Sequence, residues 1–184
     1  MEPLLAGPGP TGPRALLILV SGAPGSGKTT LAREIAGRLR LFHLHRDSIW
    51  DGLRFTRRRA PGGEVPHGVR VWYATASLLL RSKVSMVADG TLYRGWDEEN
   101  LRPLLELGDV VNVHCRAEGA LGRFADRFRR QGESEDDIAA MVARAASQQD
   151  RVVEPLDLGC PRYLVDTTRG YDPPLPDLLQ ALRG

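Results

Sequence analysis

The sequence contains few cysteines and no long apolar run. Only two cysteines, Cys115 and Cys160, occur among its 184 residues, and they lie far apart. They are too few for a disulfide framework or a cysteine-based zinc site, and they fit the reducing environment of a cytosol. The longest apolar run extends from Ala15 to Val20, far short of the length needed to cross a bilayer. These absences exclude a disulfide-rich secreted protein and predict a cytoplasmic protein that spans no membrane.

Lysine is also scarce, and the net charge is small. Arginine outnumbers lysine 23 to 2, and the formal net charge of +2 gives no overall attraction to nucleic acid. A bias toward GC-rich codons explains the preference for arginine better than a function does. A chain that hardly uses lysine nevertheless has Lys28, which indicates that this lysine is present for its chemistry.

Length and composition predict one folded domain. A hydrophobic content of 42% and a charged content of 26% are ordinary for a globular protein. A chain of 184 residues can bury a hydrophobic core without disulfides or a structural metal. Residues 1–13 are rich in proline and glycine and have no basic segment before an apolar one, so we interpret them as a disordered leader and not as a signal peptide. Residues 14–184 are expected to form the domain.

Hydrophobic periodicity predicts strands that alternate with helices. Residues 14–21 form a continuous apolar run typical of a strand covered on both faces, whereas apolar residues recur at helical spacing over 29–39. Further strands are predicted at 41–46, 84–88, 110–114 and 163–165. Further helices are predicted at 69–81, 98–107, 118–130 and 135–150, the last with Ser134 as its N-cap. This alternation predicts an α/β fold of three layers, in which helices flank a five-stranded, mainly parallel sheet.

A glycine-rich loop joins the first predicted strand to the first predicted helix. Its sequence is Gly22-Ala23-Pro24-Gly25-Ser26-Gly27-Lys28-Thr29, followed by Thr30. It matches the Walker A pattern of Gly, four residues, Gly, Lys and Ser or Thr. Glycines allow successive backbone N–H groups to turn toward phosphate oxygens, and the positive end of the following helix faces the same anion. We therefore predict that these residues bind ATP, that Lys28 contacts its β and γ phosphates, and that Thr29 binds Mg²⁺.

The residues around Asp89 indicate which class of P-loop protein the chain belongs to. Asp89 ends a predicted buried strand, where P-loop proteins commonly have an acid near the metal ion, so Asp89 and Thr29 are predicted to hold Mg²⁺. Gly90 follows Asp89 in place of the glutamate that activates water in many P-loop ATPases. The chain also lacks the Asn-Lys-x-Asp motif of GTPases, since its only other lysine is Lys83. Transfer of the phosphoryl group to an acceptor is left as the better interpretation.

Asp47 is the candidate for the group that handles an acceptor hydroxyl. It comes directly after the second predicted strand, so it should lie at the carboxyl edge of the sheet, near the phosphates. There its carboxylate could orient the acceptor hydroxyl and take its proton. The alternative is that Asp47 is the N-cap of a short helix over residues 48–55. The sequence leaves both interpretations open.

Three arginines share one face of a predicted helix. Arg123, Arg127 and Arg130 occur at helical spacing, beside an apolar stripe that contains Phe124 and Phe128. We interpret this helix as a lid on which Arg123 and Arg127 contact ATP and stabilise the charge of the transferring phosphoryl group. In a chain so rich in arginine, the alternative is a solvated helix face.

Candidates for an acceptor pocket lie near the two acids in the sequence. They are Asp47, Asp89, Trp72, Tyr73, Arg54 and Arg94. The two aromatic residues could line the pocket, although aromatic residues at helical spacing also fit a hydrophobic core. The two arginines could bind a polar or anionic acceptor. The four histidines show no spacing typical of metal ligands.

Several of these segments, in this order, resemble one family. They are residues 22–30, Asp47-Ser48-Ile49, Val87-Ala88-Asp89-Gly90-Thr91, the helix with Arg123 and Arg127, and Val165-Asp166-Thr167-Thr168. In these segments the sequence resembles the small P-loop kinases related to chloramphenicol phosphotransferase, with zeta toxin, gluconate kinase and adenylylsulfate kinase as more distant relatives. The resemblance implies that Asp47 is the catalytic base and that Thr167 lies beside the adenine. Residues 51–72 do not match chloramphenicol phosphotransferase, so chloramphenicol itself is not implied as the acceptor.

The resemblance implies transfer of the γ-phosphate of ATP to a hydroxyl of a small molecule, such as an antibiotic or another secondary metabolite in resistance or self-protection. A nucleoside or nucleotide kinase is an alternative, because it would use the same phosphate loop and lid. Another alternative is a nucleotide-dependent regulatory or toxin-like module. A third, phosphorylation of RNA ends, has only the basic segment at 57–59 in its favour, so nucleic acid is an unlikely partner. The sequence does not indicate an oligomeric state.

Overall fold

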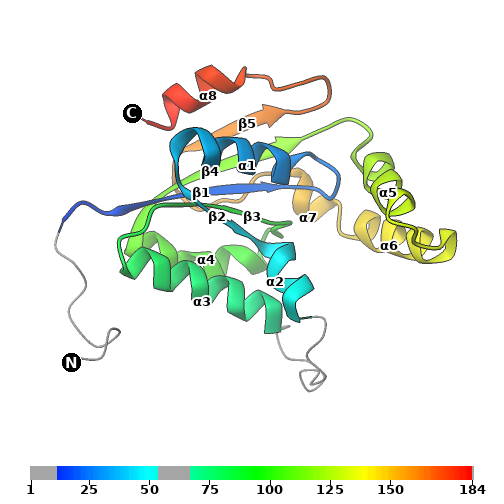
Figure 1. Cartoon of the computed structure of the whole chain (residues 1–184), viewed down its shortest axis with the longest axis horizontal. Helices are drawn as coiled ribbons and strands as arrows, with labels where there is room; N and C mark the ends of the chain where they lie inside the picture. Colours follow the sequence, from blue (N-terminus) through cyan, green and yellow to red (C-terminus); the bar gives the residue numbers. More distant parts are fainter. Residues whose placement is uncertain (1–11, 54–66, 184) are drawn as a thin grey trace.

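The computed structural model describes residues 12–53 and 67–183 of the chain. Most of the predicted leader lies outside these ranges, as do Arg54 and the arginines at 57–59. Within them, the chain forms the three-layer α/β fold that the sequence predicts (Figure 1). No helix in these ranges is both long and apolar enough to cross a membrane.

A five-stranded parallel sheet forms the middle layer. Its strands are β1 (Ala15–Gly22), β2 (Phe42–His45), β3 (Met86–Asp89), β4 (Gly108–Arg116) and β5 (Arg162–Asp166). They lie in the order β2-β3-β1-β4-β5, and every neighbouring pair is parallel. Because all five strands point the same way, the segments that follow them meet at one edge of the sheet.

Helices cover both faces of this sheet and its carboxyl edge. They are α1 (Lys28–Leu39), α2 (Arg46–Leu53), α3 (His67–Arg81), α4 (Trp96–Leu107), α5 (Ala120–Arg130), α6 (Glu135–Ser147), α7 (Asp150–Val153) and α8 (Leu175–Ala181). Figure 1 shows α1 and α8 on one face and α3 and α4 on the other. In the same view α5 and α6 extend beyond the ends of the strands. The carboxyl edge is therefore covered by a separate pair of helices, which pack against each other.

Alternating side chains of β1 supply both hydrophobic cores. Leu17 is completely buried and packs in the core that contains Trp72 of α3. Its neighbour Ile18 is also completely buried, but it packs in the core that contains Ile35 of α1. This division follows from the two-residue period of a strand, because successive side chains point to opposite faces. The continuous apolar run in β1 thus reflects burial on both sides.

Two features of the carboxyl-terminal third differ from the sequence prediction. The single helix predicted over 135–150 is two helices, α6 and α7, and α8 was not predicted. Helix α8 has only seven residues and follows two prolines, so it is too short for hydrophobic periodicity to reveal. The predicted cap of α6 is confirmed, since the hydroxyl oxygen of Ser134 accepts a hydrogen bond from the backbone N–H of Asp137 at 3.1 Å.

Candidate active site

The glycine-rich loop after β1 is shaped by close contacts with two later segments. Gly25 has φ of +80°, and a Cβ atom there would collide with the backbone carbonyl of Ala120 at the start of α5. Only glycine therefore fits, on grounds of both conformation and space. On the other side, the hydroxyl of Thr167 donates a 2.7 Å hydrogen bond to the backbone carbonyl of Ser26. The loop is thus held between the lid helix and the segment after β5.

Lys28, at the start of α1, lies inside this loop. Its side chain is largely buried, and its Nζ donates to the carbonyl oxygen of Ala23 at 3.3 Å. Burial lowers the pKa of Lys28 below its ordinary value, while the nearby carboxylates of Asp47 and Asp89 act in the opposite direction. An anionic phosphate bound in the loop would likewise favour the charged ammonium group.

Asp89, at the end of β3, is the most buried acid of the site. Its side chain is fully buried, and its Oδ2 accepts a 2.7 Å hydrogen bond from the hydroxyl of Thr29. Its Oδ1 lies 2.7 Å from Nε2 of His43 and 3.0 Å from Nδ1 of His45. Burial by itself raises the pKa of Asp89, but the hydrogen bonds from His45, Thr29 and His43 outweigh it and hold the pKa below its ordinary value. The structure therefore keeps this carboxylate ionised.

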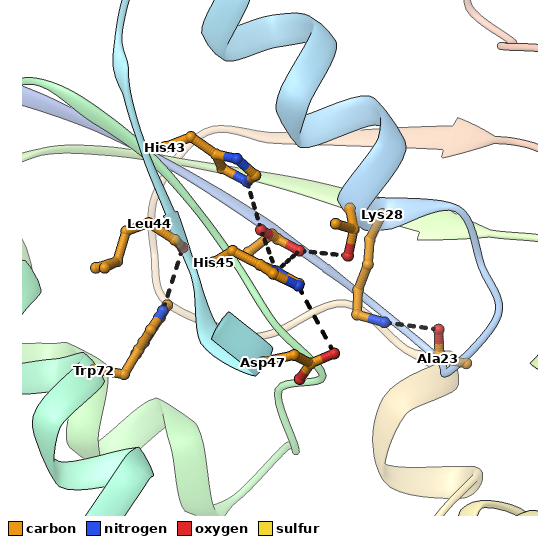
Figure 2. Close-up of polar contacts among 9 residues, drawn as sticks. Ala23, Lys28, His43, Leu44, His45, Asp47 and Trp72 are labelled. Carbon is orange, nitrogen blue, oxygen red and sulfur yellow. Dashed lines mark hydrogen bonds and ion pairs between the residues drawn. The ribbon is translucent and has the colours of Figure 1, made fainter. Parts of the chain in front are cut away.

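The donor atoms around Asp89 suit a divalent cation. The hydroxyl of Thr29 and the carboxylate of Asp89 are hard oxygen ligands of the kind that Mg²⁺ prefers, so the predicted pair fits this ion. Asp89, His43 and His45 also form a cluster in which one ligand atom from each lies within 4.8 Å of the others. Spacing along the sequence did not indicate this cluster. It forms because residues two apart in β2 point to the same side of the strand (Figure 2).

Asp47 lies at the same carboxyl edge of the sheet. It is the second residue of α2, so it does not cap a helix that begins at Ser48. Its carboxylate instead interacts favourably with the positive N-terminal end of the helix dipole. Its side chain is 56% exposed, and Oδ2 lies 4.0 Å from Nε2 of His45. Figure 2 shows the side chains of Asp47 and Lys28 on the same side of β2. An exposed carboxylate opposite the phosphate loop can reach a bound acceptor.

A cavity of about 620 Å³ joins these groups. Its lining includes Lys28, Asp47, Trp50, Thr91 and Arg127. The cavity therefore brings together the phosphate-loop lysine, the exposed carboxylate and one of the two lid arginines that the sequence singled out.

The two lid arginines have different surroundings. Arg123 donates from Nη1 to the carbonyl oxygen of Thr167 at 3.1 Å, whereas its Nε and Nη2 are buried with no partner among the described residues. Arg127 is exposed, and its guanidinium lies 5.3 Å and 5.0 Å from the ring centres of Phe124 and Phe128. Buried donors without partners are costly unless a ligand satisfies them. The nitrogens of Arg123 therefore fit a bound nucleotide, and Arg127 remains available at the cavity.

Three acceptor-pocket candidates lie elsewhere. Trp72 is completely buried and donates from Nε1 to the carbonyl oxygen of Leu44 at 3.4 Å, so it is a core residue. Tyr73 donates its hydroxyl hydrogen to buried Asp97. Arg94 is exposed and pairs with Glu98 at 3.9 Å. The apolar face of α3 covers the sheet, which explains why both aromatic residues point inward. Arg54 lies outside the described residues.

Sequence reasoning did not find a second cavity that adjoins the first. It too measures about 620 Å³, and it shares Asp47, Trp50 and Thr91 with the first cavity. Its other lining residues are Arg46, Val69, Tyr93, Trp96, Arg144, Gln148 and Arg151. Trp50 lies three residues after Asp47 in the sequence, which was the one local signal for this cavity. Apart from Arg46, its remaining residues come from segments far from α2 in the sequence.

A phosphate loop after β1, a buried acid after β3 and an arginine-bearing helix over the sheet edge together define the fold of a P-loop kinase. A family model described as AAA domain matches residues 17–156, and the chain belongs to this family. No curated protein matches the sequence.

Solved structures share this fold. A candidate kinase from Chloroflexus aurantiacus is 25% identical with a TM-score of 0.69, over 92% of this chain and 94% of that one. A sugar kinase from Janibacter sp. is 20% identical with a TM-score of 0.57, over 92% of both chains. A gluconokinase from Sinorhizobium meliloti is 17% identical with a TM-score of 0.54, over 92% of this chain and 89% of that one. The chain thus shares its fold with these proteins.

Proposed function

We propose that this protein transfers the γ-phosphoryl group of ATP to a hydroxyl group of a small molecule. The observation that carries the proposal is the first cavity, in which Lys28, Asp47 and Arg127 face one space at the carboxyl edge of the sheet. Phosphoryl transfer depends mainly on positioning and on positive charge around the transferring group, and these residues supply both.

The nucleotide would lie between the phosphate loop and the lid. Lys28 and the backbone N–H groups of residues 22–30 bind the phosphates. Arg123, whose free nitrogens are buried beside Thr167, binds the nucleotide on the side of the β5 segment. Thr29 and Asp89 hold Mg²⁺, which neutralises phosphate charge when bound. Arg127 stabilises the charge of the transferring phosphoryl group.

Asp47 acts on the acceptor. In the reaction, the bond between the γ-phosphorus and its β,γ-bridging oxygen breaks, and a bond from that phosphorus to the acceptor oxygen forms. The carboxylate of Asp47 orients the acceptor hydroxyl and receives its proton. Its exposure and its place in both cavities support this role, because the acceptor can approach from the second cavity while ATP occupies the first.

The acceptor is a small hydroxylated compound. The second cavity, of about 620 Å³, has the size of a site for such a molecule. The resemblance to chloramphenicol phosphotransferase supports an antibiotic or another secondary metabolite. Trp50 and Trp96 line the same cavity, and their rings favour a nucleoside as the second candidate, since aromatic rings stack on bases.

The test is acceptor-dependent release of ADP in the presence of ATP and Mg²⁺. The acceptors are hydroxylated antibiotics, nucleosides, nucleoside monophosphates, sugars and sugar acids, and each hit is verified by a phosphate-sized gain in mass. We expect turnover with at least one small hydroxylated compound. Turnover confined to nucleosides or their monophosphates would select the second candidate. Tight ATP binding without any phosphorylated product would favour a regulatory module and overturn the proposal.

The matched variants are Lys28→Ala and Lys83→Asn. We expect Lys28→Ala to lower kcat/KM by about a thousandfold or more, because it removes a positive charge from the phosphates. Lys83 is the only other lysine and has φ of +59°, a conformation that asparagine tolerates. Lys83→Asn should therefore leave activity unchanged.

A further inference from the structure

Two arginines that line the second cavity lie far from Asp47 in the sequence. Arg144 belongs to α6 and Arg151 to α7, and neither lines the first cavity with Lys28. The second cavity therefore contains two guanidinium groups that are separate from the phosphate site.

Arg151 is held in position by neutral groups. Its Nε and Nη2 donate to the carbonyl oxygen of Arg94 at 3.3 Å and 3.1 Å, and its guanidinium lies 5.8 Å from the ring centre of Tyr93. A carbonyl and an aromatic face orient a guanidinium without neutralising its charge. Within residues 12–53 and 67–183, neither Arg144 nor Arg151 forms an ion pair. Both side chains therefore keep a positive charge available to the cavity.

Arg46 in the same wall serves a different purpose. It is largely buried, donates to the carbonyl oxygen of Thr91 at 2.8 Å, and lies 3.6 Å from the carboxylate of buried Asp97. Its charge therefore has a partner within the protein. Arg151 also interacts electrostatically with Asp97, but among the described residues neither Arg151 nor Arg144 lies within ion-pair distance of a carboxylate.

The lining of the second cavity combines charged and aromatic side chains. Among the described residues, Asp47 is its only acidic member, and Asp47 lines both cavities. Trp50, Tyr93 and Trp96 contribute aromatic rings to the same cavity. Such a lining suits a ligand that carries a hydroxyl, a carbon skeleton and a negative charge.

We propose that the acceptor carries an anionic group, a carboxylate or a phosphate, which Arg144 and Arg151 bind while its hydroxyl lies at Asp47. This inference rests on the proposed phosphotransferase function. Guanidinium groups bind both kinds of oxyanion through paired N–H donors. Both side chains are exposed, so a ligand that enters the cavity can reach them. A neutral analogue would form no charge-assisted hydrogen bond with either arginine.

The test compares acceptors in pairs that differ in charge. The carboxylate pairs are gluconate with glucitol and shikimate with its methyl ester, and the phosphate pair is glycerol 3-phosphate with glycerol. Steady-state turnover is measured for the wild type, for Arg144→Gln and Arg151→Gln, and for Arg130→Gln. Arg130 is an exposed arginine of α5 that lines neither cavity, so its variant is the control for loss of charge.

We expect turnover with charged members and little or none with their neutral partners. The KM for the charged acceptor should rise about tenfold or more in Arg144→Gln and Arg151→Gln, because each removes a charge-assisted hydrogen bond. The KM for ATP should not change in these variants, and Arg130→Gln should behave as the wild type. Equal turnover of both members of a pair, or an acceptor KM that is insensitive to both variants, would overturn the inference.

A binding measurement separates this inference from the proposed function. Trp50 and Trp96, two of the three tryptophans, line the cavity, so their fluorescence should change when gluconate, shikimate or glycerol 3-phosphate binds without ATP. A change that the arginine variants weaken, without any phosphorylated product, would support the anion site and refute phosphotransfer. Turnover of neutral acceptors alone, without a fluorescence change on addition of an anionic compound, would support phosphotransfer and refute the anion site.

Discussion

The hydroxyl of Thr29 donates a 2.7 Å hydrogen bond to the carboxylate of Asp89, although the two residues are 60 positions apart in the sequence. Thr29 belongs to the phosphate loop after β1, and Asp89 ends β3, which lies between β2 and β1 in the sheet. The contact brings together the oxygens of the two proposed Mg²⁺ ligands. An assembled pair binds a divalent cation with less ordering of the protein.

Thr29→Val tests this pair. Valine keeps the shape of the side chain but removes the oxygen, so we expect the Mg²⁺ concentration for half-maximal activity to rise about tenfold or more. Thr29→Ser keeps the hydroxyl and should retain an Mg²⁺ requirement near that of the wild type. Titration of Mg²⁺ at a fixed ATP concentration gives this requirement directly. Equal requirements for the two variants would show that Thr29 is no ligand.

Asp47→Asn tests the role of the exposed carboxylate. The amide keeps the size of the side chain but cannot take a proton at neutral pH, so kcat should fall by about 10²- to 10⁴-fold. The affinity for ATP, measured by calorimetry, should remain close to that of the wild type. The control is Asp136→Asn, another exposed acid in the first turn of a helix, which lines neither cavity. Normal turnover in Asp47→Asn would leave Asp47 a purely structural residue of α2.

His114 makes stability depend on pH. Its ring is buried, with Nε2 2.9 Å from the carbonyl oxygen of Val153 and Nδ1 3.0 Å from the hydroxyl of Ser21. Burial lowers the pKa of His114 in the folded protein below its ordinary value of 6.5. Below pH 6.5 the unfolded chain therefore binds more protons than the folded one, and stability falls with pH until the folded pKa is reached.

Urea unfolding between pH 5 and 8 measures this effect. The free energy of unfolding of the wild type should fall on acidification, and part of that fall should be missing in His114→Gln, which cannot titrate. Because His114 packs inside the protein, the variant will be less stable at every pH. The informative quantity is the slope of the free energy of unfolding against pH. Identical slopes for the wild type and His114→Gln would contradict the prediction.

The thiol of Cys115 should be unreactive in the folded protein. Cys115 is almost completely buried, and burial raises its pKa to about 12, so little thiolate exists at pH 8. A thiol reagent added to the native protein should leave Cys115 unlabelled, and unfolding in urea should expose it. Peptide mass spectrometry distinguishes it from the more accessible Cys160. Rapid native labelling of Cys115 would contradict its place in the core.

Local sequence patterns predicted much of the fold. The apolar run over residues 14–21 and the helical spacing after it specified β1 and α1, because each pattern reflects the burial of neighbouring residues in one element. The Walker A residues form a continuous segment, so their loop could be read directly. Helix α8 escaped prediction because seven residues are too few to show a period.

The sequence by itself determined the phosphate loop, the alternation of strands and helices, and the strand-end positions of Asp47 and Asp89. Only the tertiary structure decided that His43 and His45 contact Asp89, and that Trp72 belongs to the core. It also decided that arginines of α6 and α7 share a cavity with α2. The reason is that local patterns record burial along one element, whereas contacts between distant residues depend on strand order, register and helix packing, which no single segment contains.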